Sequence, residues 1–164
     1  TYAAGGTAPL TFGLHDCYAD TKAMSSSNTN SGGWKNSAMR TTHLPAILAL
    51  MPTEVQNGIR EVSKKTSAGG ASSTIETVSD KLFLLSEVEI FGSTSYSAAG
   101  EGTQYDYYKA GNRKVKNRSG SAAAWWERSP YASYSAYFCL VNSYGSANVD
   151  AAGYARGVAF GFCF

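Results

Sequence analysis

The sequence predicts an α+β domain, with short helices in the first half of the chain and short antiparallel strands in the C-terminal half. Apolar residues recur at helical spacing between residues 37 and 62. From residue 124 onward, short apolar and aromatic runs alternate with Ser-Pro, Asn-Ser-Tyr-Gly and Ala-Gly turn signals. The chain has 164 residues, 16% of them charged and 13% aromatic, which is typical of one domain that buries its own core. We therefore expect a single domain over residues 1–164.

Two short helices are predicted in the first half of the chain. Ser37 is expected to cap the first, which extends to Met51 and in which Pro45 opens a fresh turn. The second is expected to begin at Pro52, with Glu54 near its positive end. The residues expected on their apolar faces are Met39, Leu44, Ile47, Leu48 and Met51 in the first helix and Val55, Ile59 and Val62 in the second.

The segments around these helices are mostly polar. Residues 25–34, ending in a Trp, read as an exposed Ser/Asn/Gly loop, and residues 63–80 are polar and rich in Gly and Ser. Residues 81–92 mix a buried run with near-alternation, so we expect a strand or a strand plus turn. Residues 93–122 lack periodicity and are expected to form extended loops over a compact core.

Four short strands are predicted after residue 123, at residues 124–130, 137–141, 145–149 and 157–164. Within the first, Trp125 and Trp126 must point to opposite sides, one into the core and one near a binding site.

Few residues are arranged for catalysis or metal binding. His15 and Cys17 share a strand face, but this spacing alone does not make a nucleophile and its base. His43 has no second His or carboxylate at ligand spacing. Three cysteines, at wide spacings, fit neither a disulfide framework nor a four-ligand zinc site. We therefore expect no metal, no cofactor and reduced, mostly buried cysteines.

Two sets of charged residues each have two interpretations. Glu87 and Glu89 would line one face of a strand as paired carboxylates, but capping or solvated roles are favoured because no general-acid partner can be named. The basic cluster of Arg113, Lys114, Lys116 and Arg118 lies near several tyrosines, as in nucleic-acid-binding proteins. A net charge of +2 favours a solvated loop instead, so we expect no nucleic-acid partner.

No apolar run is long enough to span a bilayer, and the N-terminus has no signal-peptide pattern. We expect a soluble protein, synthesised in a bacterial cytoplasm and without membrane insertion. Because the chain does not begin with Met, it is compatible with being the C-terminal part of a longer protein.

Residues 131–156 use an unusually small alphabet of Tyr, Ser, Ala, Asn, Gly, Asp and a few apolar residues. Lys, Glu, Gln, Met and Trp are absent, although the composition of the preceding chain would place about four to five of them in a window of this length. The codons of these five amino acids never end in a pyrimidine. Their absence is therefore expected if many codons here descend from an Asn codon whose two adenines were randomised.

This segment and its flanks resemble the variable proteins of diversity-generating retroelements. The resemblance rests on "WWERSP", on the frame Phe138-Cys139, Val141, Gly145 and Ala147, and on the terminal "GVAFGFCF". Upstream, "SSSNTNSGGW", "SAMRTTHLPAIL", "VSKKTSAG", "SDKLFLLSEVEIFG" and "AGEGTQYDYYKAGN" are similar to the constant portion of such proteins from gut phages and prophages. The resemblance covers nearly the whole chain.

The resemblance implies a C-type-lectin-like fold with a constant scaffold over residues 1–130, a variable ligand-binding region over residues 131–156 and a closing strand over residues 157–164. Strand alternation adds that Cys139 and Val141 face the core while Leu140 and Asn142 face outward, with a bulge or a second surface at Phe138. The expected ligand-binding positions are Tyr131, Ala132, Ser133, Tyr134, Ala136, Tyr137, Leu140, Asn142, Ser143, Tyr144, Ser146, Asn148, Asp150, Ala151, Gly153, Tyr154 and Arg156. The five tyrosines among them are the expected anchors.

The function implied by the resemblance is non-enzymatic binding of a host-cell surface protein or glycan, as the receptor-recognition domain of a phage tail or bacterial surface protein. A homotrimer would fit display on a virion and supply avidity. The sugar-binding motifs of calcium-dependent lectins are absent, so calcium and sugar recognition are not carried over. The alternatives are an enzyme on a formylglycine-generating scaffold, whose cysteine pair Cys139 and Cys163 do not convincingly match, a tail glycan hydrolase, and a structural virion domain. An enzyme predicts a cleft with perturbed titratable groups, whereas a binding domain predicts an open Tyr-rich patch.

Overall fold

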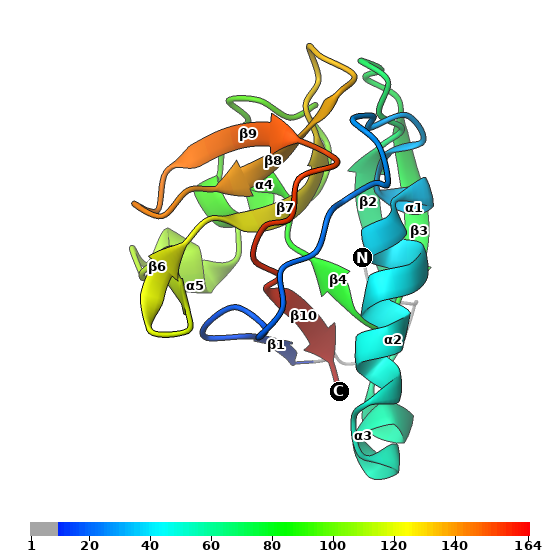
Figure 1. Ribbon diagram of the computed structural model, residues 1–164, viewed down its shortest axis with the longest axis vertical. Helices are drawn as coiled ribbons and strands as arrows, with labels where there is room; N and C mark the ends of the chain where they lie inside the picture. The colour runs from blue at the N-terminus through cyan, green and yellow to red at the C-terminus, as the bar shows by residue number, and fades with distance from the viewer. Residues whose placement is uncertain (1–9) are drawn as a thin grey trace.

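The computed structural model describes residues 10–164 and confirms an α+β fold of short helices and antiparallel strands (Figure 1). The helices are α1 (Gly33–Asn36), the π-helical turn η1 (Met39–His43), α2 (Leu44–Ala49), α3 (Thr53–Gly58), α4 (Glu87–Phe91) and α5 (Asp106–Lys109). The strands are β1 (Thr11–Gly13), β2 (Val62–Ser67), β3 (Ile75–Asp80), β4 (Phe83–Leu84), β5 (Lys116–Arg118), β6 (Ser121–Ala123), β7 (Trp125–Pro130), β8 (Tyr137–Val141), β9 (Ala147–Ala151) and β10 (Phe160–Cys163).

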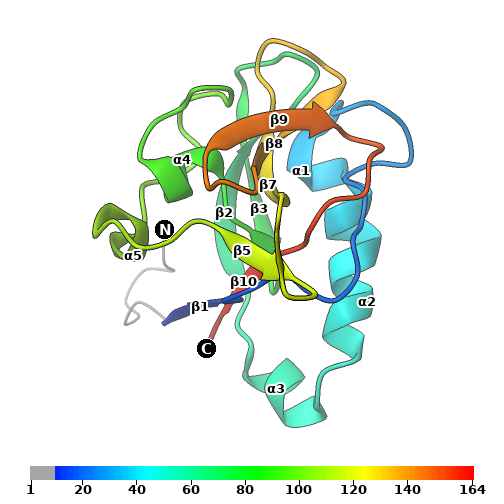
Figure 2. The same cartoon turned by 60° about the vertical axis from the view of Figure 1, so that its left-hand side comes forward.

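In the described part of the chain, the strands form four small antiparallel sheets, with the orders β1-β10-β4, β2-β3, β5-β6 and β7-β8-β9. The expected closing strand is therefore the middle of a sheet, because β10 lies between β1 and β4. The helical segment that contains α2 runs along one side of the molecule, and α3 lies at its lower end (Figure 2). Among residues 10–164, no helix is long and apolar enough to cross a membrane.

The two predicted helices of the first half are present. The Ser37 hydroxyl accepts a hydrogen bond from the backbone N–H of Arg40 at 3.2 Å, which satisfies a donor that the first helical turn leaves free. Pro45 occupies the first turn of α2, directly after η1. Pro52 precedes α3, whose first turn contains Glu54. Caps and prolines therefore predicted where these helices begin. The second helix ends earlier than predicted, because Ile59 is extended after α3 and Val62 belongs to β2.

Residues 81–92, predicted as a strand or a strand plus turn, contain a short strand and a longer helix. The strand is β4, and α4 begins after Leu85 and Ser86. Ser86 and Glu89 form a capping box, in which each side chain accepts from the backbone N–H of the other residue. Gly92, with φ of 74°, ends the helix. Glu87 and Glu89 are consequently buried helical residues, not a pair on one strand face.

The polar segment of residues 63–80 forms a hairpin that the sequence pattern did not reveal. Strands β2 and β3 pair without interruption from Val62 opposite Asp80 to Ser67 opposite Ile75. Its turn contains Gly69 and Gly70, both with positive φ. The buried face of the hairpin is largely polar, which is why hydrophobic alternation gave no signal.

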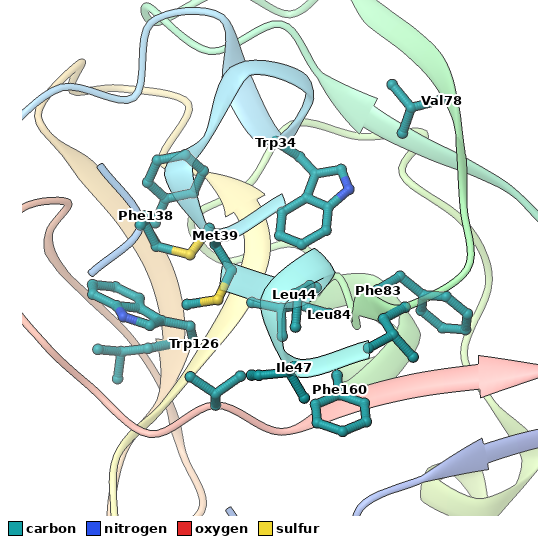
Figure 3. Packing of buried hydrophobic residues seen from close by; sticks show 14 of the residues in the cluster. Trp34, Met39, Leu44, Ile47, Val78, Phe83, Leu84, Trp126, Phe138 and Phe160 are labelled. Carbon is teal, nitrogen blue, oxygen red and sulfur yellow. The ribbon is translucent and has the colours of Figure 1, made fainter. Parts of the chain in front are cut away.

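The sheet β7-β8-β9 has core on both faces. Trp126, Phe138 and Leu140 belong to the larger hydrophobic cluster, in which Trp126 and Phe138 lie with Met39 and the side chains of α2 (Figure 3). Trp125 and Val141 belong to a second cluster with residues of α4, α5 and the segment before β10. Trp125 and Trp126 point to opposite sides of the strand, as predicted. Both are fully buried, so neither ring is part of an exposed surface.

Candidate functional site

The seventeen predicted binding positions lie in β8, β9 and the three loops that flank these strands. Six are exposed, namely Ser133, Tyr134, Tyr144, Ser146, Asn148 and Tyr154. Nine are half-buried, namely Tyr131, Ala132, Ala136, Tyr137, Asn142, Ser143, Asp150, Gly153 and Arg156. Leu140 and Ala151 are buried, at 3% and 6% exposure.

The outward orientation predicted for Leu140 was wrong. The prediction assumed that one face of β8 meets solvent, but β8 is the middle strand and core residues cover both faces. Cys139 and Val141 do point inward, as predicted. Phe138 is buried, and the irregularity predicted there lies in the opposite strand, where the pairing shifts between Trp126 and Pro130. Leu140 and Ala151 are therefore removed from the set of contact residues.

The three exposed tyrosines among the predicted binding positions are divided between the two ends of the β8–β9 hairpin. Tyr144 lies in its turn, whereas Tyr134 and Tyr154 lie in loops at the opposite end. A five-residue strand spans about 14 Å. Tyr144 is therefore separated from the other two by the length of the hairpin.

Five loops meet at the Tyr134 end of the molecule, and we call their exposed part the tip surface. They are residues 25–30, 68–74, 94–97, 131–136 and 152–155, and the ribbon shows the first, second and fourth side by side at the top (Figure 1). These loops contain no Asp, Glu, Lys or Arg. Their residues are Tyr, Ser, Thr, Asn, Gly and Ala, the types that supply area and adaptable hydrogen bonds in antibody loops.

Asn30 holds the tip loops together. Its side-chain Nδ2 donates to the backbone carbonyl oxygens of Tyr131, Tyr134 and Tyr137 at 3.2, 3.1 and 2.7 Å. Its Oδ1 accepts from the backbone N–H of Gly70 in the β2–β3 turn at 2.7 Å. The sequence predicted an exposed loop here, but Asn30 is only 1% exposed. Its side-chain amide can be buried because it forms hydrogen bonds with four backbone groups that would otherwise need water.

The other bonds that anchor residues 131–136 and 152–155 also use their backbone. Ala132 donates its N–H to the carbonyl of Tyr96 at 2.9 Å, and Ala152 donates to the carbonyl of Ala136 at 2.9 Å. Gly153 donates its N–H to Asn28 Oδ1 at 3.1 Å. The conformation of these loops thus depends on peptide groups that every residue except Pro supplies.

Aromatic side chains cover part of the tip. Tyr134 is 52% exposed and packs edge-on against Tyr137, with ring centroids 4.9 Å apart. Tyr131 packs edge-on against Tyr96 at 5.7 Å. Tyr154 is 54% exposed. Such partly exposed, partly supported rings can bury area on binding with little loss of conformational entropy.

Three other predicted positions have structural roles for their side chains. Asn142 Oδ1 accepts from the backbone N–H groups of Tyr144 and Ser146, both at 3.0 Å, and so forms the hairpin turn. Asp150 and Arg156 form an ion pair. These side chains are occupied within the protein rather than free for a partner.

A polar groove is the second feature of interest. It has a volume of about 1210 Å³ and lies beside β2, β4 and the segment before α5. At its wall, Lys64 Nζ donates to Glu89 Oε1 at 2.7 Å and to the Tyr105 hydroxyl at 3.2 Å. Arg128, which is fully buried, donates to the other oxygen of Glu89 at 2.5 Å. This network was not predicted from the sequence, although Ser86 and Glu89 have the spacing of a capping box.

Burial and neighbouring charges perturb the groups of this network. Burial and the Arg128 charge lower the pKa of Lys64 to about 8. Burial raises the pKa of Tyr105, and the Glu89 charge adds to this effect. The pKa of Glu89 lies below its ordinary value because Arg128 and Lys64 together outweigh the cost of burial. A buried carboxylate that bonds two cations is favoured in its ionised form, and such groups occur in structural networks as well as in active sites.

No described group of three His, Cys, Asp or Glu residues is arranged to hold a metal ion. Cys17, Cys139 and Cys163 are free, the last two buried. The basic cluster differs from the predicted solvated loop, because Lys116 is 9% exposed and donates to the backbone carbonyls of Leu14 and His15.

Residues 11–162 match the family model described as a domain of unknown function, DUF6273. Neither the comparison with curated proteins nor the comparison with solved structures produced a match.

Proposed function

This chain belongs to the DUF6273 family, and we propose that it is a non-enzymatic binding domain that recognises its partner through the tip surface. The observation that carries the proposal is the backbone anchorage of residues 131–136 and 152–155 by Asn30, Asn28 and main-chain groups. A binding surface that must change its side chains needs loops whose shape does not depend on them.

The proposal includes diversification of this surface. The small alphabet of residues 131–156 is the composition expected from adenine-directed mutagenesis. Its exposed and half-buried loop residues lie where replacement of a side chain leaves the backbone anchoring bonds intact. The α+β fold is compatible with the C-type-lectin-like scaffold of retroelement variable proteins. We assign the freely replaceable positions to Tyr131, Ala132, Ser133, Tyr134, Ala136 and Tyr154.

The partner that we propose is a protein or glycan of a host-cell surface, bound from a phage tail or a bacterial surface. An uncharged tip lacks the electrostatic steering of charged interfaces, so recognition would depend on buried aromatic area and hydrogen bonds. Modest single-site affinity would be compensated by display in several copies, such as a homotrimer.

An enzyme is the second candidate, because the groove beside Lys64 and Glu89 is a cleft with perturbed titratable groups. However, Lys64 and Glu89 are already bonded to each other. Glu89 accepts from Arg128, Lys64 and the Ser86 N–H, and Arg128 also donates to three backbone carbonyls. This arrangement stabilises the contact between β2, α4 and β7 and occupies both oxygens of Glu89. Glu101 also lines the groove. Its Oε1 accepts from the backbone N–H of Ser67 at 2.7 Å, its Oε2 has no partner among the described residues, and burial raises its pKa.

A pair of libraries tests the proposed function. In the first, Ser133, Tyr134 and Tyr154 are randomised, and in the control library the buried Thr66, Ser67 and Ser129 are randomised. Both are displayed on yeast and selected for binding to hen lysozyme as a defined probe protein. We expect most members of the first library to fold and some to bind, whereas most control members fail to fold. A first library that unfolds as often as the control would contradict the proposal.

Sequencing of the gene and its neighbourhood tests the diversification separately. We expect a reverse-transcriptase gene and a near-identical repeat that differs from the codons of residues 131–156 only at template adenines. Ordinary codon usage with no repeat would leave the binding surface in place but exclude this origin of its sequence.

A further inference from the structure

A second cavity, of about 300 Å³, lies between β1, β10, α5 and the segment that leads into β5. Its apolar wall includes Leu14, Leu85, Val115, Ala159 and Phe160. It is remote from the tip, because β1 and β10 lie toward the opposite end of the molecule from residues 131–136 (Figure 1). Its volume is at the lower end of the range for ligand sites and suits one small molecule.

The cationic side chains that line this cavity are those of Arg113 and Lys116, and the imidazole of His15 lies beside them. Among residues 10–164, no Asp or Glu lines it. Tyr105, Tyr107 and Tyr108 add phenol rings and hydroxyls to the same wall. The cavity therefore combines an aromatic and apolar interior with cationic groups.

Lys116 is a buried cation without a carboxylate partner among the described residues. Its Nζ donates to the carbonyl oxygens of Leu14 and His15 and lies 5.3 Å from the centre of the Trp125 ring. The nearby Asp16 instead accepts the backbone N–H of Asn117 at 2.8 Å and pairs with His15 at 3.4 Å. Burial lowers the pKa of Lys116, while Cys17 and Asp16 oppose this effect. A buried ammonium with only neutral partners is costly, and an anion beside it would offset that cost.

Arg113 supplies the second cation. It is exposed, and its only side-chain hydrogen bond among the described residues is a long one of 3.5 Å to Asn117 Oδ1. A guanidinium held this loosely can rotate toward the carboxylate of a ligand and donate hydrogen bonds to both of its oxygens.

From these contacts we infer that the cavity is a binding site for a small aromatic carboxylate. The carboxylate lies between Lys116 and Arg113, and the ring lies against Tyr108, Phe160 and Leu85. Offset or edge-on packing on the tyrosine rings favours an aromatic ligand over an aliphatic one of the same charge. The site is independent of the proposed recognition at the tip.

The test uses benzoate and its neutral isostere benzamide, with binding followed by amide chemical shifts of the folded protein. We expect benzoate to cause saturable shifts around residues 113–116 and 159–161, and benzamide to bind at least about tenfold more weakly. Arg113→Gln should weaken benzoate binding about tenfold. The control Lys109→Gln, which removes an exposed cation of α5 that does not line the cavity, should leave it unchanged.

Lys116→Met is expected to abolish benzoate binding, and Arg113→Gln keeps the test decisive if that buried variant does not fold. Equal affinities for benzoate and benzamide, equal losses in Arg113→Gln and Lys109→Gln, or no saturable shifts would each overturn the inference. Cyclohexanecarboxylate binding as tightly as benzoate would overturn the aromatic preference. Tyr134→Ala, at the tip, should not affect benzoate binding, so failure of one proposal is distinguishable from failure of the other.

Discussion

Arg156 donates from Nε to Asp150 Oδ2 at 2.7 Å, and its second terminal nitrogen lies 2.5 Å from the same oxygen. Both residues were predicted as separate ligand contacts, but the ion pair joins β9 to the chain that leads into β10. Asp150 Oδ1 also accepts the N–H of Ala151 at 2.8 Å. Positions 150 and 156 are therefore coupled, and a change at one alters the surroundings of the other.

A double-mutant cycle of Asp150→Ala and Arg156→Ala measures this coupling. Because the two side chains are 22% and 38% exposed, solvent screens the pair and we expect a coupling free energy of about 0.5–1 kcal/mol. The free energy of unfolding in urea, measured for the wild type, both single variants and the double variant, gives this value. Strictly additive effects would mean that the pair contributes nothing in solution.

Asn30→Ala is expected to lower the free energy of unfolding by about 3 kcal/mol or more, because four backbone groups lose their partner in a buried site. Asn30→Asp should be comparably harmful, since a carboxylate cannot donate to the three carbonyls. Urea unfolding and hydrogen exchange of residues 131–137 measure the effect.

The matched control for Asn30 is Asn28→Ala, which removes one bond at an exposed site and should cost less than about 1 kcal/mol. If Asn28→Ala were as destabilising as Asn30→Ala, the central role of Asn30 in the tip would be wrong.

Tyr134→Ala and Tyr154→Ala are expected to change the free energy of unfolding by no more than about 0.5 kcal/mol each. Both side chains are half exposed, and the bonds described above hold the loops through their backbone. Tyr108→Ala, at 7% exposure in the second core cluster, should cost about 3 kcal/mol or more. Thermal and urea unfolding of the three variants provide the comparison. Large losses at the tip would show that its side chains support the fold.

Glu127 is fully buried, and neither of its carboxylate oxygens has a hydrogen-bond partner among the described residues. Burial raises its pKa well above the ordinary 4.5, and the charges of Glu87 and Glu101 add to this effect. The folded protein therefore keeps a proton that the unfolded chain releases above about pH 4.5. The contribution of this protonation to the free energy of unfolding is fully present below that pH and is lost as the pH rises through the folded-state pKa.

Glu127→Gln removes this titration while keeping the shape of the side chain. We expect it to raise the free energy of unfolding near neutral pH by about 1 kcal/mol, or the melting temperature by about 2–4 °C. Urea unfolding at several pH values between about 4.5 and 8 should show a flatter profile than the wild type. A variant with the same pH profile as the wild type would contradict a raised pKa at this residue.

Local patterns in the sequence determined the α+β class, the two early helices and the four late strands. The backbone near the two helices is constrained by the cap at Ser37 and by the fixed φ of Pro45 and Pro52. The apolar run predicted as a strand at residues 137–141 is a strand over the same residues in the structure. Residues 131–136 and 152–155, which belong to the segment with the small alphabet, lie in two of the loops of the tip. Because these signals depend on residues only a few positions apart, they can be recognised without knowledge of the fold.

Only the tertiary structure decided which faces and groups are covered. Leu140 is buried because a second layer covers the face that alternation assigned to solvent, and Lys116 is buried because β5 packs against the segment after β1. Asn30 acquires its role from carbonyls about a hundred residues away. Sequence periodicity shows only which side of a segment prefers to be buried. Burial on both sides, and hydrogen bonds between loops that are distant in the sequence, depend on how the segments pack in the folded protein.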